Sequence, residues 1–211
     1  MFNVCPNCGE YRVDKMVLPE GPYAVCPVCE YRHKFVRLPL FVVTGASGAG
    51  KTTTCLTAAA STKDFVVMES DILYTDEFKQ PERYRELWLR VCKNISQAGK
   101  PVILCGSCIP SQFESRVERR YFSDIHYLAM VCEDEALALR LRSRPDWRRT
   151  SDDEYIARHV EFNRWLKENA SSTEPPMTLL DTTEITVDES VTRLLHWAGK
   201  IYLRTESRFS A

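Results

Sequence analysis

A glycine-rich segment from Gly45 to Thr52 reads GASGAGKT, and only Thr44 separates it from the apolar run LPLFVV. It fits the pattern G-x-x-x-x-G-K-[ST], and an apolar strand before it with a helix after it is the context that this pattern requires. Glycines allow the backbone N–H groups of such a loop to turn towards phosphate oxygens, and the next helix adds its positive N-terminal end. A chance glycine-rich turn is the alternative, but the flanking elements favour a site for a nucleoside triphosphate.

The residues of this loop have separate expected roles. Lys51 should reach the β- and γ-phosphates, and the Thr52 hydroxyl should bind Mg²⁺. The residues that we expect to contact ATP are Gly45, Ala46, Ser47, Gly48, Ala49, Gly50, Lys51, Thr52 and Thr53.

Two carboxylates follow the next apolar run, in the sequence VVMESDILY. Glu69 and Asp71 are two residues apart, so in an extended segment they share one face. Ligands of open α/β sheets lie at the carboxyl ends of the strands, where this pair is expected. We expect Glu69 to support Mg²⁺ and Asp71 to orient or deprotonate an attacking hydroxyl. Two solvated loop carboxylates are the alternative.

An arginine-rich segment, ALALRLRSRPDWRR, has five arginines between residues 140 and 149. Arg140 and Arg144 are one helical turn apart on one face. Guanidinium groups bind phosphoryl oxygens and offset the charge that develops during transfer. We therefore expect this segment to close on phosphates, with Arg144 and Arg148 as the catalytic arginines, while other members are surface charges.

Two cysteine pairs near the N-terminus have the spacing C-x₂-C-x₁₇-C-x₂-C. This spacing predicts a structural zinc site with the ligands Cys5, Cys8, Cys26 and Cys29. Four thiolates complete a tetrahedral Zn²⁺ site and leave no position for catalysis. A redox pair is the alternative, and it would need a thioredoxin-like context that the sequence lacks. Cys105-x-x-Cys108 is a third such pair, interpreted as a packed thiol and a loop thiol, and Cys55 as a small core residue.

The elements that must position these groups alternate between strands and helices after residue 36. The expected strands are Leu40–Val43, Phe65–Met68, Val102–Cys105, Ile125–Val131 and Met177–Leu180. Capping boxes at Ser151–Glu154 and Thr186–Glu189 predict the starts of two helices between and after them. Such alternation predicts a parallel sheet covered by helices on both faces. We expect a zinc ribbon over residues 1–36 and an α/β unit over residues 37–211.

Length and composition agree with this organisation. The chain has 211 residues, of which 44% are hydrophobic and 27% charged, and a net charge of -1. These values are typical of a folded water-soluble protein and exclude a strong electrostatic attraction to nucleic acid or an anionic membrane. The absence of a signal-peptide pattern and of a long apolar run predicts a cytoplasmic protein with no membrane contact.

From about Pro39 to Ala198 the chain resembles the small P-loop kinases, which include nucleoside, nucleotide and shikimate-type kinases. The resemblance rests on GASGAGKTT (a Walker A motif), on ESD after the second strand, and on GKPVILCGSCIPSQFE. The arginine-rich RLRSRPDWR and the LDTT after the last strand add to it. The family implies a five-stranded parallel sheet of order 2-3-1-4-5 in a P-loop NTPase fold.

The same resemblance implies further site residues. It places Arg140 beside the adenine ring, and Arg144 on the transferred phosphate. It also places the segment from Asp181 to Thr183 near the base, with Asp181 and Thr183 as expected contacts. The chain departs from nucleotide kinases after the third strand, where Cys105 to Pro110 replaces their Asp-Gly-x-Pro-Arg loop. Magnesium support would therefore come from Glu69. The acceptor residues stay open, because Tyr84 and Trp88 are spaced equally well for core packing.

These features predict an ATP- and Mg²⁺-dependent phosphotransferase that also holds structural Zn²⁺. Its partners would be ATP and a small acceptor, most simply a nucleoside or nucleoside monophosphate. The alternative is a nucleotide-dependent switch or ATPase that binds nucleic acid or a protein through its zinc ribbon.

Overall fold

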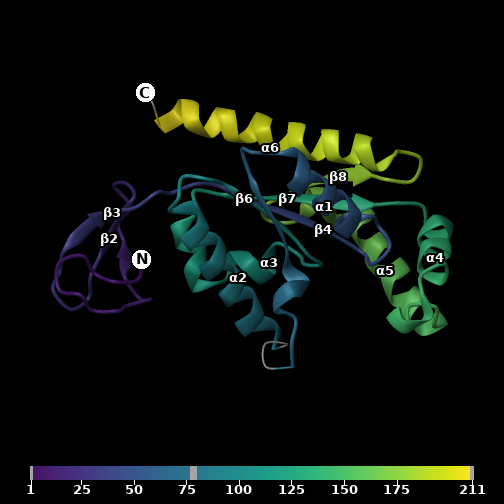
Figure 1. Ribbon diagram of the computed structural model, residues 1–211, viewed down its shortest axis with the longest axis horizontal. Coiled ribbons are helices and arrows are strands. Elements are labelled where there is room, and N and C mark those ends of the chain that lie inside the picture. Colours follow the sequence, from purple (N-terminus) through teal and green to yellow (C-terminus); the bar gives the residue numbers. More distant parts are fainter. Residues whose placement is uncertain (1, 77–79, 210–211) are drawn as a thin grey trace.

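The computed structural model describes residues 2–76 and 80–209, and its main feature is a five-stranded parallel sheet (Figure 1). The strand order is β5-β6-β4-β7-β8, which is 2-3-1-4-5 when the strands of this sheet are counted along the chain, as expected. The strands are β4 (Leu40–Gly45), β5 (Val66–Glu69), β6 (Val102–Cys105), β7 (Ile125–Val131) and β8 (Met177–Asp181). Because β4 lies at the centre, the loop that follows it opens at the middle of the sheet edge.

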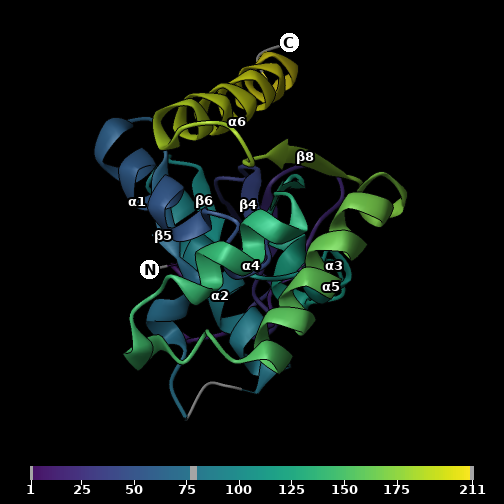
Figure 2. The same ribbon diagram turned by 90° about the vertical axis from the view of Figure 1, so that its right-hand side faces the viewer.

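Helices cover both faces of this sheet, because alternate residues of the central strands are buried on opposite sides. In β4, Phe41 and Val43 pack towards α1 and α6, whereas Leu40 and Val42 pack towards α2. Figures 1 and 2 show α6 lying along α1 on one side, and α2 with α3 on the other. The α-helices are α1 (Lys51–Ser61), α2 (Pro81–Ser96), α3 (Ser111–Glu114), α4 (Asp134–Arg142), α5 (Asp153–Asn169) and α6 (Val187–Phe209). In the part of the chain that the structure describes, four 3₁₀ turns complete the fold: η1 (Ser70–Leu73), η2 (Val117–Tyr121), η3 (Asp146–Arg148) and η4 (Ala170–Ser172).

The N-terminal part of the chain forms a separate antiparallel sheet of three short strands, shown in purple in Figure 1. These strands are β1 (Met16–Val17), β2 (Tyr23–Val25) and β3 (Arg32–Lys34). The cysteine pairs lie in the turns around this sheet, so the small antiparallel sheet and its cysteines have the form of a zinc ribbon. We call residues 2–36 the ribbon and residues 37–209 the body.

The ribbon is attached to the body by aromatic and ionic contacts. Phe2 and Phe35 of the ribbon pack edge-on against Tyr121 of η2, with ring centroids 5.1 and 5.7 Å from it. Beside them the fully buried Lys93 ammonium donates to a Glu118 carboxylate oxygen at 2.6 Å and to the Asn3 side-chain oxygen at 3.1 Å. The ribbon therefore shares buried contacts with α2 and η2 of the body.

One helix start differs from the expected one. Asp152, not Ser151, caps α5, and its carboxylate accepts a hydrogen bond from the Tyr155 N–H at 3.0 Å. Ser151 lies one residue before the cap position, so the predicted capping box from Ser151 to Glu154 is wrong. At the start of α6 the expected reciprocal bonds are present, since Thr186 Oγ1 accepts from the Glu189 N–H and the Glu189 carboxylate accepts from the Thr186 N–H.

Cys55 of α1 and Cys105 at the end of β6 form a disulfide, with Cα atoms 6.7 Å apart. The interpretation of both as unbonded thiols is therefore wrong. The two residues are 50 positions apart in sequence, and only the packing of α1 on the sheet brings them together. Cys108 keeps a free thiol, whose pKa burial raises to about 11.

Within the described residues, no helix is long and apolar enough to span a membrane.

Candidate active site

A cavity of about 420 Å³ opens at the carboxyl ends of the central strands. It receives side chains from the loop after β4, from the end of β5, from the start of α2, from the loop after β6 and from the segment between α4 and α5. The residues that line it are Ser47, Gly48, Gly50, Lys51, Thr52, Thr53, Glu69, Ser70, Asp71, Tyr74, Pro81, Tyr84, Arg85, Cys105, Gly106, Ser107, Arg144, Arg148, Tyr155 and His159. The topology thus brings most of the expected site residues to one place.

The glycine-rich loop has the backbone geometry of a phosphate cradle. Gly48 and Gly50 have φ angles of 93° and 92°, in the left-handed region that favours glycine. A Cβ atom on Gly45 would lie 2.5 Å from the Met130 carbonyl oxygen, so the neighbouring strand also requires glycine there. Ala46 and Ala49 are fully buried, so any contact they make with a phosphate is made by the backbone.

The Lys51 ammonium folds back over this loop. It donates to the carbonyl oxygens of Gly45 and Ala46 at 2.8 and 2.9 Å. Burial lowers the pKa of Lys51 to about 8, and the nearby Arg144 acts in the same direction, while Asp71 opposes them. A bound triphosphate would place negative charge beside this ammonium and would so favour its charged form.

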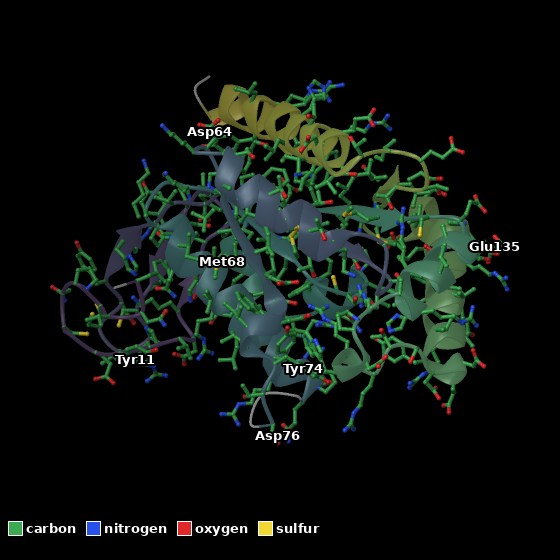
Figure 3. All side chains as sticks on the ribbon, turned by 45° about the vertical axis from the view of Figure 1, so that its right-hand side comes forward. Tyr11, Asp64, Met68, Tyr74, Asp76 and Glu135 are labelled. Carbon is green, nitrogen blue, oxygen red and sulfur yellow. A yellow bond between two sulfur atoms is a disulfide. The ribbon has the colours of Figure 1, made fainter. Side chains whose placement is uncertain are left out.

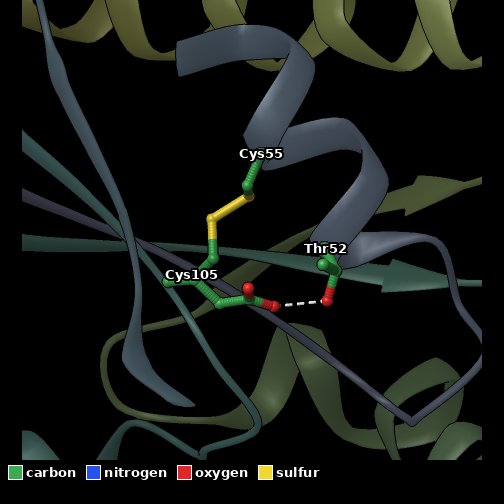
Figure 4. Close-up of a disulfide and its surroundings, with 4 residues drawn as sticks. Thr52, Cys55 and Cys105 are labelled. Atoms are coloured by element: carbon green, nitrogen blue, oxygen red, sulfur yellow. Dashed lines mark hydrogen bonds between the residues drawn. A yellow bond between two sulfur atoms is a disulfide. The ribbon is translucent and has the colours of Figure 1, made fainter. Parts of the chain in front are cut away.

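Glu69 lies directly beside the loop, because the Thr52 hydroxyl donates to its carboxylate (Figure 4). This arrangement fits a Mg²⁺ ion, which binds a loop hydroxyl and carboxylate oxygens, either directly or through water. Asp71 is exposed in the same cavity, one residue after β5 gives way to η1. Glu69 and Asp71 therefore face one space, although the segment is no longer extended at Asp71.

Two aromatic side chains of α2 fix the backbone next to Asp71. The Tyr84 hydroxyl and the Trp88 indole N–H both donate to the Ser70 carbonyl oxygen, at 2.6 and 3.0 Å. Tyr84 also lines the cavity, whereas Trp88 is fully buried. From the sequence, the spacing of Tyr84 and Trp88 fitted either core packing or a place in the acceptor pocket. In the structure Trp88 packs in the core, and Tyr84 lines the cavity.

The three arginines singled out in the sequence lie in two places. Arg144 donates to the Ser47 hydroxyl at 2.9 Å, and Arg148 lines the same cavity. Arg140 instead lies on the other side of the loop, where it donates to the Thr182 and Thr183 carbonyl oxygens. There it lines a second cavity of about 320 Å³ with Gly48, Gly50 and Thr53.

Thr183 and Asp181 belong to the turn after β8. Asp181 accepts hydrogen bonds from the Thr183 N–H and hydroxyl, at 2.8 and 2.5 Å, and so shapes the turn itself. Thr182, which belongs to the segment expected near the base, lines the second cavity and donates its hydroxyl to the Ala49 carbonyl at 3.1 Å.

Arg85 and His159 line the cavity although nothing in the sequence indicated that they would lie there. Arg85 of α2 donates to the Gln112 side-chain oxygen at 2.7 Å and to the Ser107 carbonyl at 3.3 Å. His159 of α5 accepts the Ser47 backbone N–H at 3.2 Å. No local pattern marks either residue: Arg85 stands among many charged helix residues, and His159 lies 112 positions from Ser47.

The cysteine cluster fits a zinc ion. Its four Sγ atoms lie within 4.8 Å of one another. The Cys5–Cys29 and Cys8–Cys26 sulfur pairs are 3.6 and 3.8 Å apart. A tetrahedron with Zn–S bonds of about 2.3 Å has edges of about 3.8 Å, so these spacings are those of a tetrathiolate site. The Asn7 side chain donates to Cys29 Sγ, and this bond is the main cause that lowers the pKa of Cys29 to about 6.

Several solved structures have a similar fold. The Deinococcus radiodurans tunicamycin resistance protein gives a TM-score of 0.58 at 18% identity, over 77% of this chain and 96% of that one. A gluconokinase from Sinorhizobium meliloti gives 0.54 at 17% identity, over 83% and 99%. A sugar kinase from Janibacter gives 0.53 at 20% identity, over 77% and 95%.

This chain has the fold of the small P-loop kinases. No protein-family model matches the sequence, and no curated protein matches it. The kinase fold covers most of the body, and the described cavity lies at its phosphate loop.

Proposed function

We propose that this protein transfers the γ-phosphate of ATP to a small acceptor, with Mg²⁺ as cofactor. The observation that carries the proposal is the meeting of Lys51, the Thr52–Glu69 pair and Asp71 in one cavity above the phosphate loop. Lys51 and the loop amides would hold the β- and γ-phosphates, and Thr52 and Glu69 would hold Mg²⁺. Arg144 and Arg148 would offset charge on the transferred group.

Asp71 would receive or orient the acceptor, because it is the exposed carboxylate of this cavity that is not engaged by Thr52. For a hydroxyl acceptor it would accept the proton as the oxygen attacks phosphorus. The backbone next to Asp71 is fixed, because the Ser70 carbonyl oxygen accepts hydrogen bonds from Tyr84 and Trp88.

Arg85 supports an acceptor that carries a negative group. Among the described residues, its guanidinium donates to neutral oxygens, those of Gln112 and Ser107, and to no carboxylate. The two N–H donors on its Nη1 have no acceptor among these oxygens and remain for an anionic group, to which arginine gives charge-assisted hydrogen bonds. A nucleoside monophosphate satisfies this preference better than a neutral nucleoside, and a hydroxylated carboxylic acid satisfies it as well.

The test is ATP turnover by the zinc-loaded protein with a panel of nucleosides, nucleoside monophosphates, sugars and hydroxy acids. We expect one class to stimulate turnover, and Asp71→Asn to remove that stimulation while ATP affinity is kept. Asp64→Asn is the matched control, because Asp64 is exposed far from the cavity (Figure 3).

Arg85→Ala should raise KM for an anionic acceptor by about 10- to 100-fold, as expected for a lost charge-assisted hydrogen bond, with Arg85→Lys in between. Turnover that no small molecule stimulates, but that RNA or a protein raises, would support the nucleotide-dependent switch instead.

A further inference from the structure

His159 reaches the phosphate loop from α5, the helix that follows the arginine-rich segment. Its Nδ1 accepts the Ser47 backbone N–H at 3.2 Å, and its ring lies against Tyr155, with centroids 4.4 Å apart. The Ser47 side chain is engaged at the same time, because its hydroxyl accepts from Arg144 at 2.9 Å. Ser47 is thus the loop residue at which two later segments of the chain meet.

The bond to Ser47 determines which nitrogen of the imidazole carries the proton. A backbone N–H can only donate, so Nδ1 must be the unprotonated nitrogen, and the proton of the neutral ring is on Nε2. His159 lines the cavity together with Lys51, Arg144 and Arg148, the cations expected around the transferred phosphoryl group. The ring therefore brings one N–H donor to the phosphate-binding cavity.

The surroundings keep this ring neutral. Burial is the main cause that lowers the pKa of His159 to about 4, and the charges of Lys51, Arg158 and Arg144 add to it. Arg148 also faces the cavity, and Tyr155 covers the ring. A neutral imidazole N–H differs from an arginine side chain, because it can give a phosphate a directional hydrogen bond without adding a positive charge.

We propose that His159 is a catalytic residue whose Nε2–H donates a hydrogen bond to the transferred phosphoryl group, while Ser47 holds its Nδ1. The proposal rests on the proposed use of this loop for ATP. In this proposal the Ser47 backbone N–H also orients His159. Helix α5 then contributes a residue that contacts the transferred phosphoryl group. No bond of the substrate is made or broken by His159 in this step.

Nitrogen-15 NMR of the imidazoles in the full zinc-loaded protein tests the proposal directly, with His159 assigned from His159→Gln. In the free protein we expect the neutral tautomer with the proton on Nε2. Mg²⁺ with a non-hydrolysable ATP analogue should shift the Nε2 resonance more than Mg²⁺ with ADP, because only the analogue has a γ-phosphate. A proton on Nδ1, or equal responses to both nucleotides, would overturn the proposal. Failure of both nucleotides to bind would instead reject the proposed function.

Variants give the second test. His159→Ala should lower kcat by about 10- to 100-fold with less than a threefold change in KM for ATP, as expected for one lost hydrogen bond to a charged group. His159→Gln, whose amide can accept from Ser47 and donate to phosphate, should recover most of this loss. His196→Ala is the matched control, because His196 is exposed on α6. Equal kcat values for the alanine variant and the unmodified protein would contradict a role in transfer.

Discussion

At the scale of single residues, the site depends on hydrogen bonds that cross long stretches of sequence. The loop from Gly45 to Thr52 and the cluster of four cysteines were predicted from short patterns, because phosphate binding and zinc binding require fixed residue types at fixed spacing. Arg85 and His159 have no such pattern. Their place in the cavity follows from how α2 and α5 pack, which the local sequence does not specify.

The depressed pKa of His159 predicts acid sensitivity. Its folded-state pKa of about 4 lies below the ordinary value of 6.5, so the unfolded chain binds the proton first as the pH falls. The contribution of the neutral His159 ring to the free energy of unfolding is complete above pH 6.5 and is lost as the pH falls towards 4. Urea unfolding at pH 7 and pH 4.5 should therefore show a smaller loss of stability in His159→Gln than in the unmodified protein. His196→Gln should behave like the unmodified protein, and equal losses in all three would contradict the prediction.

At the scale of elements, the five strands were predicted within about one or two residues, because buried parallel strands are short continuous apolar runs. Pairing between distant elements was not predictable in the same way. The Cys55–Cys105 disulfide requires α1 and β6 to be side by side, and the sequence shows only two cysteines in apolar settings. The capping error at α5 was a local one, since serine and aspartate are both good caps and adjacent here.

The α5 cap can be tested by a pair of substitutions. Asp152→Ala should lower the free energy of unfolding by about 1 kcal/mol, because the Tyr155 N–H loses its side-chain acceptor. Ser151→Ala should change it by less than about 0.5 kcal/mol, since Ser151 is exposed and outside the helix. Chemical denaturation of both variants measures the difference, and a larger effect at Ser151 would show that the cap is misplaced.

The disulfide predicts a dependence of stability on thiol reductants. A bond across 50 residues removes unfolded-state entropy worth about 4 kcal/mol, an upper value that native strain reduces. A dithiol reductant, with zinc in excess to protect the ribbon, should lower Tm of the unmodified protein and leave Tm of Cys55→Ala/Cys105→Ala unchanged. Alkylation in denaturant without reductant should label seven of the nine cysteines. Labelling of all nine would refute the bond.

At the scale of the whole molecule, a buried charge pair of the body is joined to the ribbon by a hydrogen bond to Asn3. Lys93 and Glu118 are both almost completely buried, and the Lys93 ammonium also reaches Asn3 of the ribbon. Removing one partner leaves an unpaired buried charge, which costs about 3–5 kcal/mol. The ribbon should therefore influence the stability of the body, which shares these contacts.

A double-mutant cycle measures the coupling between Lys93 and Glu118, the body pair that contacts Asn3 through Lys93. Lys93→Met and Glu118→Leu should each destabilise the zinc-loaded protein by about 3 kcal/mol, and the double variant should lose clearly less than their sum. Arg90 also contacts Glu118, at 3.4 Å, so some of the charge is compensated in Lys93→Met. Strict additivity in urea unfolding would mean that Lys93 and Glu118 do not stabilise each other.

For the proposed phosphotransferase, the Ser70 carbonyl, which accepts hydrogen bonds from both Tyr84 and Trp88, guides any redesign for a new acceptor. Changes at these two residues would move the backbone beneath Asp71 and impair every acceptor alike. Tyr74 and Arg85 line the same cavity, but they are not the residues that fix the Ser70 backbone. Tyr74 is exposed at the rim, beside Asp76 (Figure 3). Libraries that vary Tyr74 and Arg85 and keep the α2 aromatics should therefore shift preference while preserving turnover.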